Sequence, residues 1–166
     1  MAAPDFAFRP MTIADIPMVA GWTETPPVRE WWVEADGSPA QPVDEEWLAA
    51  ADSRQWIVQL DDTPLGFIQD YDPHAWPGHH FAYLPPGARG IDQFIGIPTQ
   101  IGRGYGSRFI SLFMRKLFAQ GVVAVGTDPH PNNARAIRAY EKAGFVRRQT
   151  VTTDWGPAAL MDMFAR

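Results

Sequence analysis

The first third of the chain alternates between short periodic segments and an irregular one. Phe6 to Met11 alternates apolar and polar residues, which is typical of a half-buried strand. Thr12-Ile13-Ala14-Asp15 has the spacing of a capping box and predicts a helix that runs toward Trp22. Prolines and a tryptophan pair interrupt any period from Thr25 to Gln41, so we expect a loop there, followed by a helix over Val43 to Asp52.

The middle of the chain predicts strands around one long loop. Gln55 to Leu60 and Leu65 to Tyr71 are apolar, β-prone runs, and the Asp61 to Pro64 segment between them has turn composition, so a hairpin is expected. Asp72 to Gly90 is rich in proline, glycine and histidine and has no period. A loop of that length is usually functional. Gly90 to Pro98 then predicts another strand.

The last third predicts two helices and three strands. Gly106 to Gln120 has a helical period, with one apolar face made of Ile110, Phe113, Met114, Leu117 and Phe118. Val122 to Gly126 predicts a short buried strand. Asn133 to Ala143 predicts a second helix, with Asn133 as its cap and Gly144 ending it. Two closing strands follow, Phe145 to Thr152 and Ala158 to Phe164.

Together these elements predict an α/β fold in which a mixed sheet carries helices on its faces. The chain has 166 residues and a mass of 18.5 kDa, which suits one domain over 1–166. The pattern contains no internal repeat.

Composition narrows the classes of function. The chain has no cysteine, which excludes disulfides, cysteine-ligated zinc and acyl transfer through a thiolate. A net charge of −5 argues against nucleic acid as a partner and suits a small cationic substrate. No segment has the length or apolarity of a membrane span or a signal peptide, so we expect a cytoplasmic protein without a membrane partner.

Three glycines, Gly102, Gly104 and Gly106, lie between a predicted strand and a predicted helix. Backbone amides and the helix dipole at such a place can bind an anion, so a phosphate-bearing ligand fits. The same glycines could also make only a tight turn. The sequence lacks the Lys-Ser or Lys-Thr of a nucleotide-triphosphate loop, and it lacks the spacing of a dinucleotide fingerprint.

A second motif follows about thirty residues later. Asn133 opens a helix, Tyr140 lies seven residues on, and Glu-Lys-Ala-Gly-Phe completes the segment Thr127 to Phe145. Together with the glycine loop, this segment resembles the acetyl-CoA half of the GNAT N-acetyltransferase superfamily. Within it, the chain is similar to the aminoglycoside 6′-N-acetyltransferases from about Phe8 to Met161. The similarity also rests on Glu30-Trp31-Trp32, Arg89 to Gln93, Thr150 to Thr153 and Gly156-Pro157-Ala158.

The resemblance implies a fold, a cosubstrate and the site that binds it. The fold would be the GNAT acyltransferase fold, with a splayed mixed sheet and flanking helices. Acetyl-CoA would be the cosubstrate, and no metal would be needed. The residues implied in its binding are Phe94, Ile95, Gly96, Gly102, Arg103, Gly104, Tyr105, Gly106, Ser107 and Asn133.

The resemblance also implies catalytic roles. Asp92 matches the family's active-site aspartate and would accept a proton from the acceptor ammonium or orient the amine; it could also be a satisfied strand carboxylate. Tyr140 would protonate the departing thiolate, and the amides of Phe94 to Gly96 would bind the oxyanion. No covalent acetyl-enzyme is expected without a cysteine, so transfer should be direct in a ternary complex.

The resemblance also implies residues for the acceptor site. The candidate residues are Trp31, Trp32, Gln69, Tyr71, Asp92 and Asp128. Asp128 could instead open a turn, and the two tryptophans could be core residues. The chain departs from the family between Asp72 and Ala88, where histidines replace a more acidic stretch. We expect these to be solvated loop histidines and not metal ligands.

Three functions therefore stay open. The first is aminoglycoside 6′-N-acetylation, the second is acetylation of another small amine such as a siderophore precursor or polyamine, and the third is a non-catalytic acyl-CoA-binding domain. The retention of both Asp92 and Tyr140 favours an enzyme. The sequence is compatible with a monomer or a homodimer.

Overall fold

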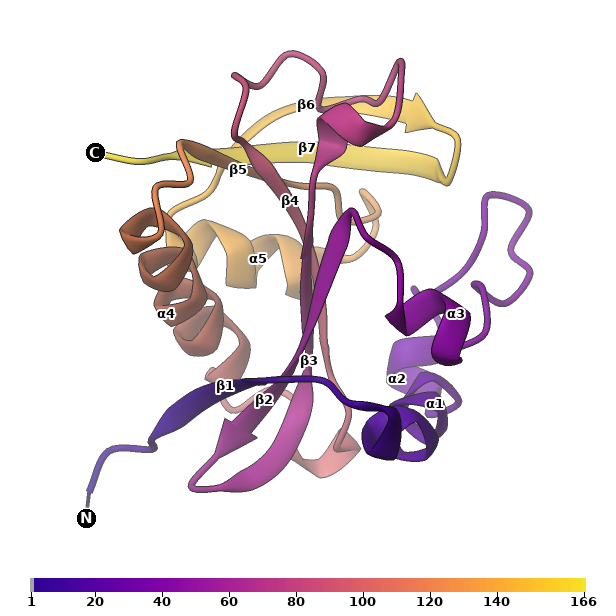
Figure 1. The fold of residues 1–166 in the computed structure, drawn as a ribbon, viewed down its shortest axis with the longest axis vertical. Helices are drawn as coiled ribbons and strands as arrows, with labels where there is room; N and C mark the ends of the chain where they lie inside the picture. Colours follow the sequence, from indigo (N-terminus) through magenta and orange to yellow (C-terminus); the bar gives the residue numbers. More distant parts are fainter. Residues whose placement is uncertain (1) are drawn as a thin grey trace.

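The computed structural model describes residues 2–166. Its strands form one seven-stranded mixed sheet (Figure 1). The strand order is β1-β2-β3-β4-β5-β7-β6. All neighbours are antiparallel except β4 and β5. The strands are β1 (Phe6–Pro10), β2 (Ser53–Leu60), β3 (Thr63–Tyr71), β4 (Arg89–Ile95), β5 (Ala124–Thr127), β6 (Val146–Thr153) and β7 (Gly156–Phe164).

Helices cover both sides of this sheet. The α4 and α5 helices lie on one side of the central strands, and α1, α2 and α3 lie on the other (Figure 1). Their bounds are α1 (Ile16–Thr23), α2 (Pro26–Arg29), α3 (Glu45–Leu48), α4 (Tyr105–Ala119) and α5 (Ala134–Ala143). The predicted α/β class with a mixed sheet is confirmed.

Local capping explains where several helices begin and end. The Asp15 carboxylate accepts from the Thr12 amide at 2.9 Å, so the predicted capping box forms, at the short 3₁₀ helix Ile13–Asp15 that leads into α1. Asn133 caps α5, where its Oδ1 accepts from the Ala136 amide at 3.2 Å. Gly144 ends the same helix with φ of 112°, as predicted.

The segment between α1 and β2 differs from its prediction. The expected loop over 25–41 contains α2, because Pro26 and Pro27 occupy the first helical turn, where proline is tolerated. The helix expected over 43–52 shortens to α3, Glu45–Leu48. The β2–β3 turn is also tighter than predicted, since Asp61 and Asp62 alone form it, both with positive φ.

The sheet splays at the β4–β5 junction. These two strands pair only at Arg89 with Val125 and at Gly90 with Gly126. Beyond that point the Thr127 hydroxyl donates to the Ile91 carbonyl at 3.2 Å, and β4 continues alone on this edge. The predicted splayed sheet is confirmed, and it exposes the backbone of the second half of β4.

A buried charge network fixes the strands that lead to this opening. Asp70 is fully buried, and its carboxylate accepts from Arg54, Arg89 and the Trp56 indole at 2.7 to 3.0 Å. Two arginines and an indole thus satisfy the buried carboxylate and join β2, β3 and β4. The apolar face of α4 packs beside them, with Ile110, Phe113, Met114 and Leu117 buried as predicted and Phe118 partly buried.

Candidate active site

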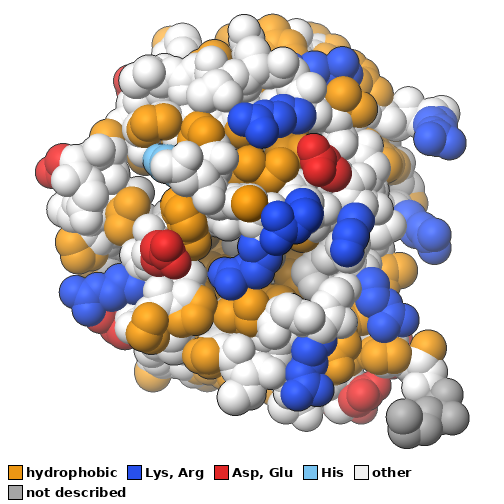
Figure 2. Space-filling view, turned by 180° about the vertical axis from the view of Figure 1, so that it is seen from behind, with side chains coloured by type: hydrophobic (Ala, Val, Ile, Leu, Met, Phe, Trp, Pro, Cys, Tyr) orange, Lys and Arg blue, Asp and Glu red, His pale blue; other side chains and the backbone are white. Residues whose placement is uncertain are grey.

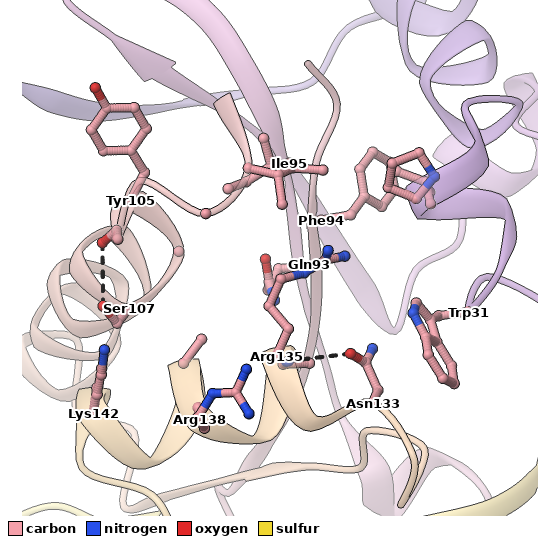
Figure 3. A pocket seen from close by; sticks show the side chains of 18 of the residues that line it. Trp31, Gln93, Phe94, Ile95, Tyr105, Ser107, Asn133, Arg135, Arg138 and Lys142 are labelled. Carbon is pink, nitrogen blue, oxygen red and sulfur yellow. Dashed lines mark hydrogen bonds between the residues drawn. The ribbon is translucent and has the colours of Figure 1, made fainter. Parts of the chain in front are cut away.

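A cleft of about 320 Å³ opens between the splayed end of β4, the start of α4 and one face of α5. Figure 3 shows Tyr105 and Ser107 at one side, Trp31 at the opposite side, and Arg138 and Lys142 rising from α5. The predicted cofactor residues Phe94, Ile95, Gly102, Gly104, Tyr105, Gly106, Ser107 and Asn133 all line it, so one cavity brings together two motifs that lie far apart in the sequence. We call it the cofactor cleft.

The glycine turn prepares the start of α4 for an anion. Gly102 and Gly104 have φ of 80° and 77°, a backbone region that favours glycine. Gly104 is the N-cap, so the first-turn amides of α4, from Tyr105 onward, have no intrahelical acceptor. The Ser107 hydroxyl donates to the Gly104 carbonyl at 3.2 Å and stabilises the turn. The helix therefore presents free amides and its positive dipole end to the cleft.

A basic stripe on α5 faces the same cleft and was missed by the sequence analysis. Arg135, Arg138 and Lys142 line the cavity together with Asn133. Their spacing of three and four residues places them on one helix face, and this spacing was the signal available in the sequence. Lys and Arg side chains gather over the middle of the molecule's rear face (Figure 2). Amide donors and three cations suit a ligand that carries several phosphates.

Two predicted cofactor residues lie outside the cleft walls. Arg103 donates its Nε to the Thr99 carbonyl at 3.2 Å and braces the glycine turn from outside. The Gly96 amide donates to the Leu65 carbonyl at 2.9 Å, within the pairing of β3 and β4. It is therefore not free to bind an oxyanion, and that prediction is wrong for Gly96.

Strand alternation identifies the amide that is free. Because Gly96 points its amide toward β3, Phe94 does the same, while the intervening Ile95 and Gln93 point theirs to the splayed edge. Ile91 shows the same orientation, since its carbonyl accepts from Thr127 on β5. Of the three predicted residues, only Ile95 has its N–H directed into the cofactor cleft.

A second cleft, of about 660 Å³, lies on the other side of β4. It brings together all six predicted acceptor residues, Trp31, Trp32, Gln69, Tyr71, Asp92 and Asp128. Three further carboxylates, those of Glu30, Glu34 and Asp52, also line it, and none of its lining residues in the described chain is Lys or Arg. We call it the acceptor cleft. Its acidity comes from several segments and does not require an acidic loop.

Asp92 lies at the middle of β4 and opens onto the acceptor cleft. The Gln69 amide, on the neighbouring strand, donates to its Oδ2 at 2.8 Å. Burial, with a further contribution from the charge of Asp128, raises the pKa of the Asp92 carboxyl to about 7, although the Gln69 hydrogen bond opposes the rise. A carboxylate with this pKa is a far better proton acceptor at neutral pH than an ordinary aspartate.

The loop histidines differ from their prediction. His79 is buried and its ring stacks on His80, with 4.0 Å between the centroids. The His80 Nε2 lies 2.6 Å from Asp128 Oδ2. Only His74 is exposed as expected. The loop folds back onto the sheet, so two of its three histidines form part of the acceptor site and its surroundings.

The two tryptophans separate the clefts. Trp31 and Trp32 line both cavities. Trp32 also packs edge-on against Phe67 and Phe94, so it is both a core contact and a wall. Trp31 lies against the ring of His130 at 5.4 Å between centroids. Trp32 therefore both lines the acceptor cleft and packs against the core, and its part in acceptor binding stays a prediction.

Comparison with known proteins identifies the family. A sequence profile described as acetyltransferase (GNAT) domain matches residues 12–153. The chain belongs to the GNAT acetyltransferase family. An aminoglycoside N(6′)-acetyltransferase type 1 of Klebsiella pneumoniae is 36% identical over 160 residues, which cover 92% of this chain and 80% of the relative. A kanamycin resistance protein of Rhizobium radiobacter is 49% identical over 77 residues, covering 46% of this chain and 71% of that protein.

Solved structures agree with this GNAT assignment. Aminoglycoside acetyltransferase AAC(6′)-Ib in complex with coenzyme A superimposes with a TM-score of 0.86 at 34% identity, covering 96% of this chain and 95% of that one. Its complex with coenzyme A and kanamycin gives a TM-score of 0.85 at the same coverage. The cofactor cleft of this GNAT domain thus has the features that a coenzyme A ligand needs.

Tyr140 of this GNAT domain is more deeply buried than we expect for a residue that reaches the sulfur of coenzyme A. It is 4% exposed, packs edge-on against Phe145 and does not line the cofactor cleft. Burial, together with the charges of Asp92 and Asp128, raises its pKa, so the phenol keeps its proton at neutral pH. Proton delivery by Tyr140 stays a prediction.

No helix within residues 2–166 is both long and apolar enough to cross a membrane. Across the same residues, no group of three or more His, Cys, Asp or Glu side chains is arranged to hold a metal ion.

Proposed function

We propose that this GNAT protein is an acetyl-CoA-dependent aminoglycoside 6′-N-acetyltransferase. The observation that carries the proposal is the opposite charge of two clefts that meet at β4. The cofactor cleft offers free amides and basic side chains, whereas the acceptor cleft is lined by five carboxylates. A phosphate-rich donor and a polycationic acceptor would each find complementary charge. The relatives named above support the aminoglycoside as acceptor.

The cofactor cleft would bind the donor along α4 and α5. Free amides from Tyr105 onward would hold the pyrophosphate, with Arg138 and Lys142 supplying positive charge. Asn133 would meet the pantetheine arm while capping α5. Acetyl-CoA supplies an acetyl group activated as a thioester. Gly102 and Gly104 set the turn, whereas Arg103 contributes from outside the cleft.

The acceptor cleft would hold and activate the amine. Asp92 would accept a proton from the acceptor ammonium, directly or through water, and so leave a nucleophilic amine beside β4. Gln69 would keep its carboxylate oriented, and Trp31, Trp32 and Tyr71 would line the walls that exclude water. Asp128 would bind a second positive charge of the same acceptor.

Transfer would be direct. A carbon–nitrogen bond forms between the amine and the acetyl carbon while the carbon–sulfur bond breaks. The nitrogen, which has already given one proton to Asp92, releases a second proton to solvent. The thiolate takes one proton to leave as free coenzyme A, and the group that gives it is reprotonated from solvent. The Ile95 amide, directed to the splayed edge, would donate to the carbonyl oxygen as it gains negative charge. Tyr140 would supply the proton for the thiolate. Both substrates must then be bound together, which predicts sequential kinetics.

A thiol-release assay tests the proposed function. The protein is incubated with acetyl-CoA and, in turn, kanamycin, tobramycin, lysine derivatives and spermidine, while free thiol and product mass are followed. Kanamycin and tobramycin should be turned over faster than the other amines. Turnover of only the other amines would replace the proposal with a different small-amine acetyltransferase, and no turnover of any amine would favour a non-catalytic acyl-CoA-binding domain.

A further inference from the structure

The acceptor loop, residues 72–88, is anchored on the sheet where β4 and β5 pair. Phe81 is fully buried, and its ring lies over Gly126, where a Cβ would come within 2.8 Å of the ring. Gly126 is the β5 partner of Gly90, which in turn lies beneath the ring of Tyr71. The glycine pair thus gives two aromatic rings access to the sheet at the one place where β4 and β5 meet. Because Phe81 anchors the loop, the two residues just before it, His79 and His80, are held close to the sheet.

His79 adds a second constraint. Its Nδ1 accepts from the Phe81 amide at 3.0 Å, which leaves the proton on Nε2. Burial, followed by the neighbouring charge of His80, lowers the pKa of His79 to about 4, so the ring is neutral at neutral pH. This neutral ring stacks on His80, and Trp155 closes the cluster at 6.0 Å from the His80 ring. The His80 ring has little freedom to turn away from the sheet.

His80 and Gln69 make equivalent contacts to the carboxylates of Asp128 and Asp92. Gln69 donates to Oδ2 of Asp92, and His80 lies at hydrogen-bonding distance from Oδ2 of Asp128. Within residues 2–166, neither Oδ1 has a hydrogen-bond partner, and both residues line the acceptor cleft. Asp128 makes no hydrogen bond to a backbone amide there, so it does not act as the turn opener that the sequence allowed.

We propose that His80 is a positioning residue of the acceptor site, which holds Asp128 by one oxygen so that the other can bind an ammonium group of the acceptor. Asp92 and Asp128 would then be two carboxylates that each have one oxygen held by a side chain from a different segment, with the other oxygen open to the acceptor. His80 touches no reacting atom, and its effect on acceptor binding passes through Asp128. The inference rests on the proposed function, because it assigns a role within that acceptor cleft.

The consequence is a selective effect on acceptor binding. Without His80, the Asp128 carboxylate can rotate away from the orientation that this contact fixes, so it is less often in position to accept a hydrogen bond from the ammonium. We expect His80→Ala to raise the KM for kanamycin about tenfold, with kcat within about threefold of wild type and the KM for acetyl-CoA unchanged. His80→Gln keeps a side-chain N–H donor near the position of Nε2, and it should restore most of the kanamycin KM.

The test uses initial rates for both substrates, with each variant's melting temperature measured as a check on folding. His74→Ala is the matched control, because His74 is an exposed histidine of the same loop whose ring hydrogen-bonds with the Pro85 carbonyl and does not line the acceptor cleft. Asp128→Asn and the double variant His80→Ala/Asp128→Asn complete a double-mutant cycle, which measures the coupling between the two residues. If His80 acts through Asp128, the double variant should resemble Asp128→Asn alone.

The outcomes separate the two proposals. A wild-type protein that acetylates no aminoglycoside contradicts the proposed function and with it the role of His80. If the wild type is active, three results would each overturn only the role of His80: an unchanged kanamycin KM in His80→Ala, equal losses in kcat and in both KM values, or additive effects in the double variant. Rescue by His80→Gln with a non-additive cycle would support it.

Discussion

The two clefts that meet at β4 are built in different ways. The cofactor cleft uses backbone amides at one helix start and a row of cations on one helix face, so two continuous segments supply most of its chemistry. The acceptor cleft uses side chains from the segment after α2, from α3, β3, β4 and the long loop, from the segment after β5, and from the turn between β6 and β7. Backbone amides offer the same donors whatever the side chains are, whereas the chemistry of the acceptor cleft depends on the identity of its side chains.

Charge follows the same division. Arg135, Arg138 and Lys142 line the cofactor cleft, and the acceptor cleft is lined by carboxylates. The net charge of −5 hides this arrangement, because it sums two local charges of opposite sign. Variants in one cleft should therefore leave binding in the other unchanged.

The largest effect should come from Asp92→Asn. Asparagine keeps the hydrogen bond to Gln69 but cannot accept a proton, so kcat/KM for kanamycin should fall by about tenfold to a hundredfold or more. The KM for acetyl-CoA should stay within about twofold of wild type. Initial rates for both substrates measure this, with Glu141→Gln, an exposed carboxylate of α5, as the control. An unchanged rate would remove Asp92 from the mechanism.

A smaller loss, confined to the other substrate, should come from Arg138→Ala. The loss of one charge-assisted contact to a phosphate should raise the KM for acetyl-CoA about tenfold, while the KM for kanamycin stays the same. Added salt should weaken the wild type more than the variant, because exposed charges are screened. Arg115→Ala, an exposed arginine of α4 outside both clefts, is the control. A change in the kanamycin KM instead would break the division between the clefts.

The pH dependence should report the Asp92 carboxyl. Its pKa is raised to about 7, so it is protonated below that pH and cannot accept a proton, and kcat/KM for kanamycin should rise with pH through about 7. Asp128, His80, Tyr71 and Tyr140 surround it. Because the negative charge of Asp128 contributes to the raised pKa, Asp128→Asn should move this rise to lower pH. Profiles of kcat/KM for kanamycin from about pH 5 to about pH 9 measure this rise. If Asp92→Asn shows the same rise at the same pH, the titrating group is not Asp92.

The smallest effect concerns stability. The folded protein disfavours ionised Asp92, since its pKa is raised from 3.8 to about 7. The loss of stability caused by ionised Asp92 is absent below the pKa that this group has in the unfolded chain. It grows as the pH rises and is complete above about 7. Because the side chain opens on a cleft, we expect Asp92→Asn to gain only about 1–2 kcal/mol at pH 8, a rise in Tm of roughly 2–8 °C. Thermal melts at about pH 8 and about pH 5 should show the gain shrinking at the lower pH.

The sequence predicted most of the strands, the two long helices and the glycine turn because each depends on a local pattern, but it missed α2 and made α3 too long. Alternation marked the strands, capping residues marked α5, and the glycines marked the start of α4. The free amide of Ile95 could not be predicted, because it depends on which edge of β4 loses its partner. The contact of His80 with Asp128 joins residues 48 positions apart in a loop without periodicity, so no local pattern indicated it.

Analysis of the reaction product tests the central claim most directly. Wild-type protein, acetyl-CoA and kanamycin should yield coenzyme A and a mono-acetylated drug in equal amounts, and NMR of the product should place the acetyl group on the 6′-amine. An acetyl group on a different amine would contradict the proposed orientation of the acceptor in its cleft. No acetylated product, with acetyl-CoA still bound to the protein, would contradict the assignment of this site as an aminoglycoside acetyltransferase.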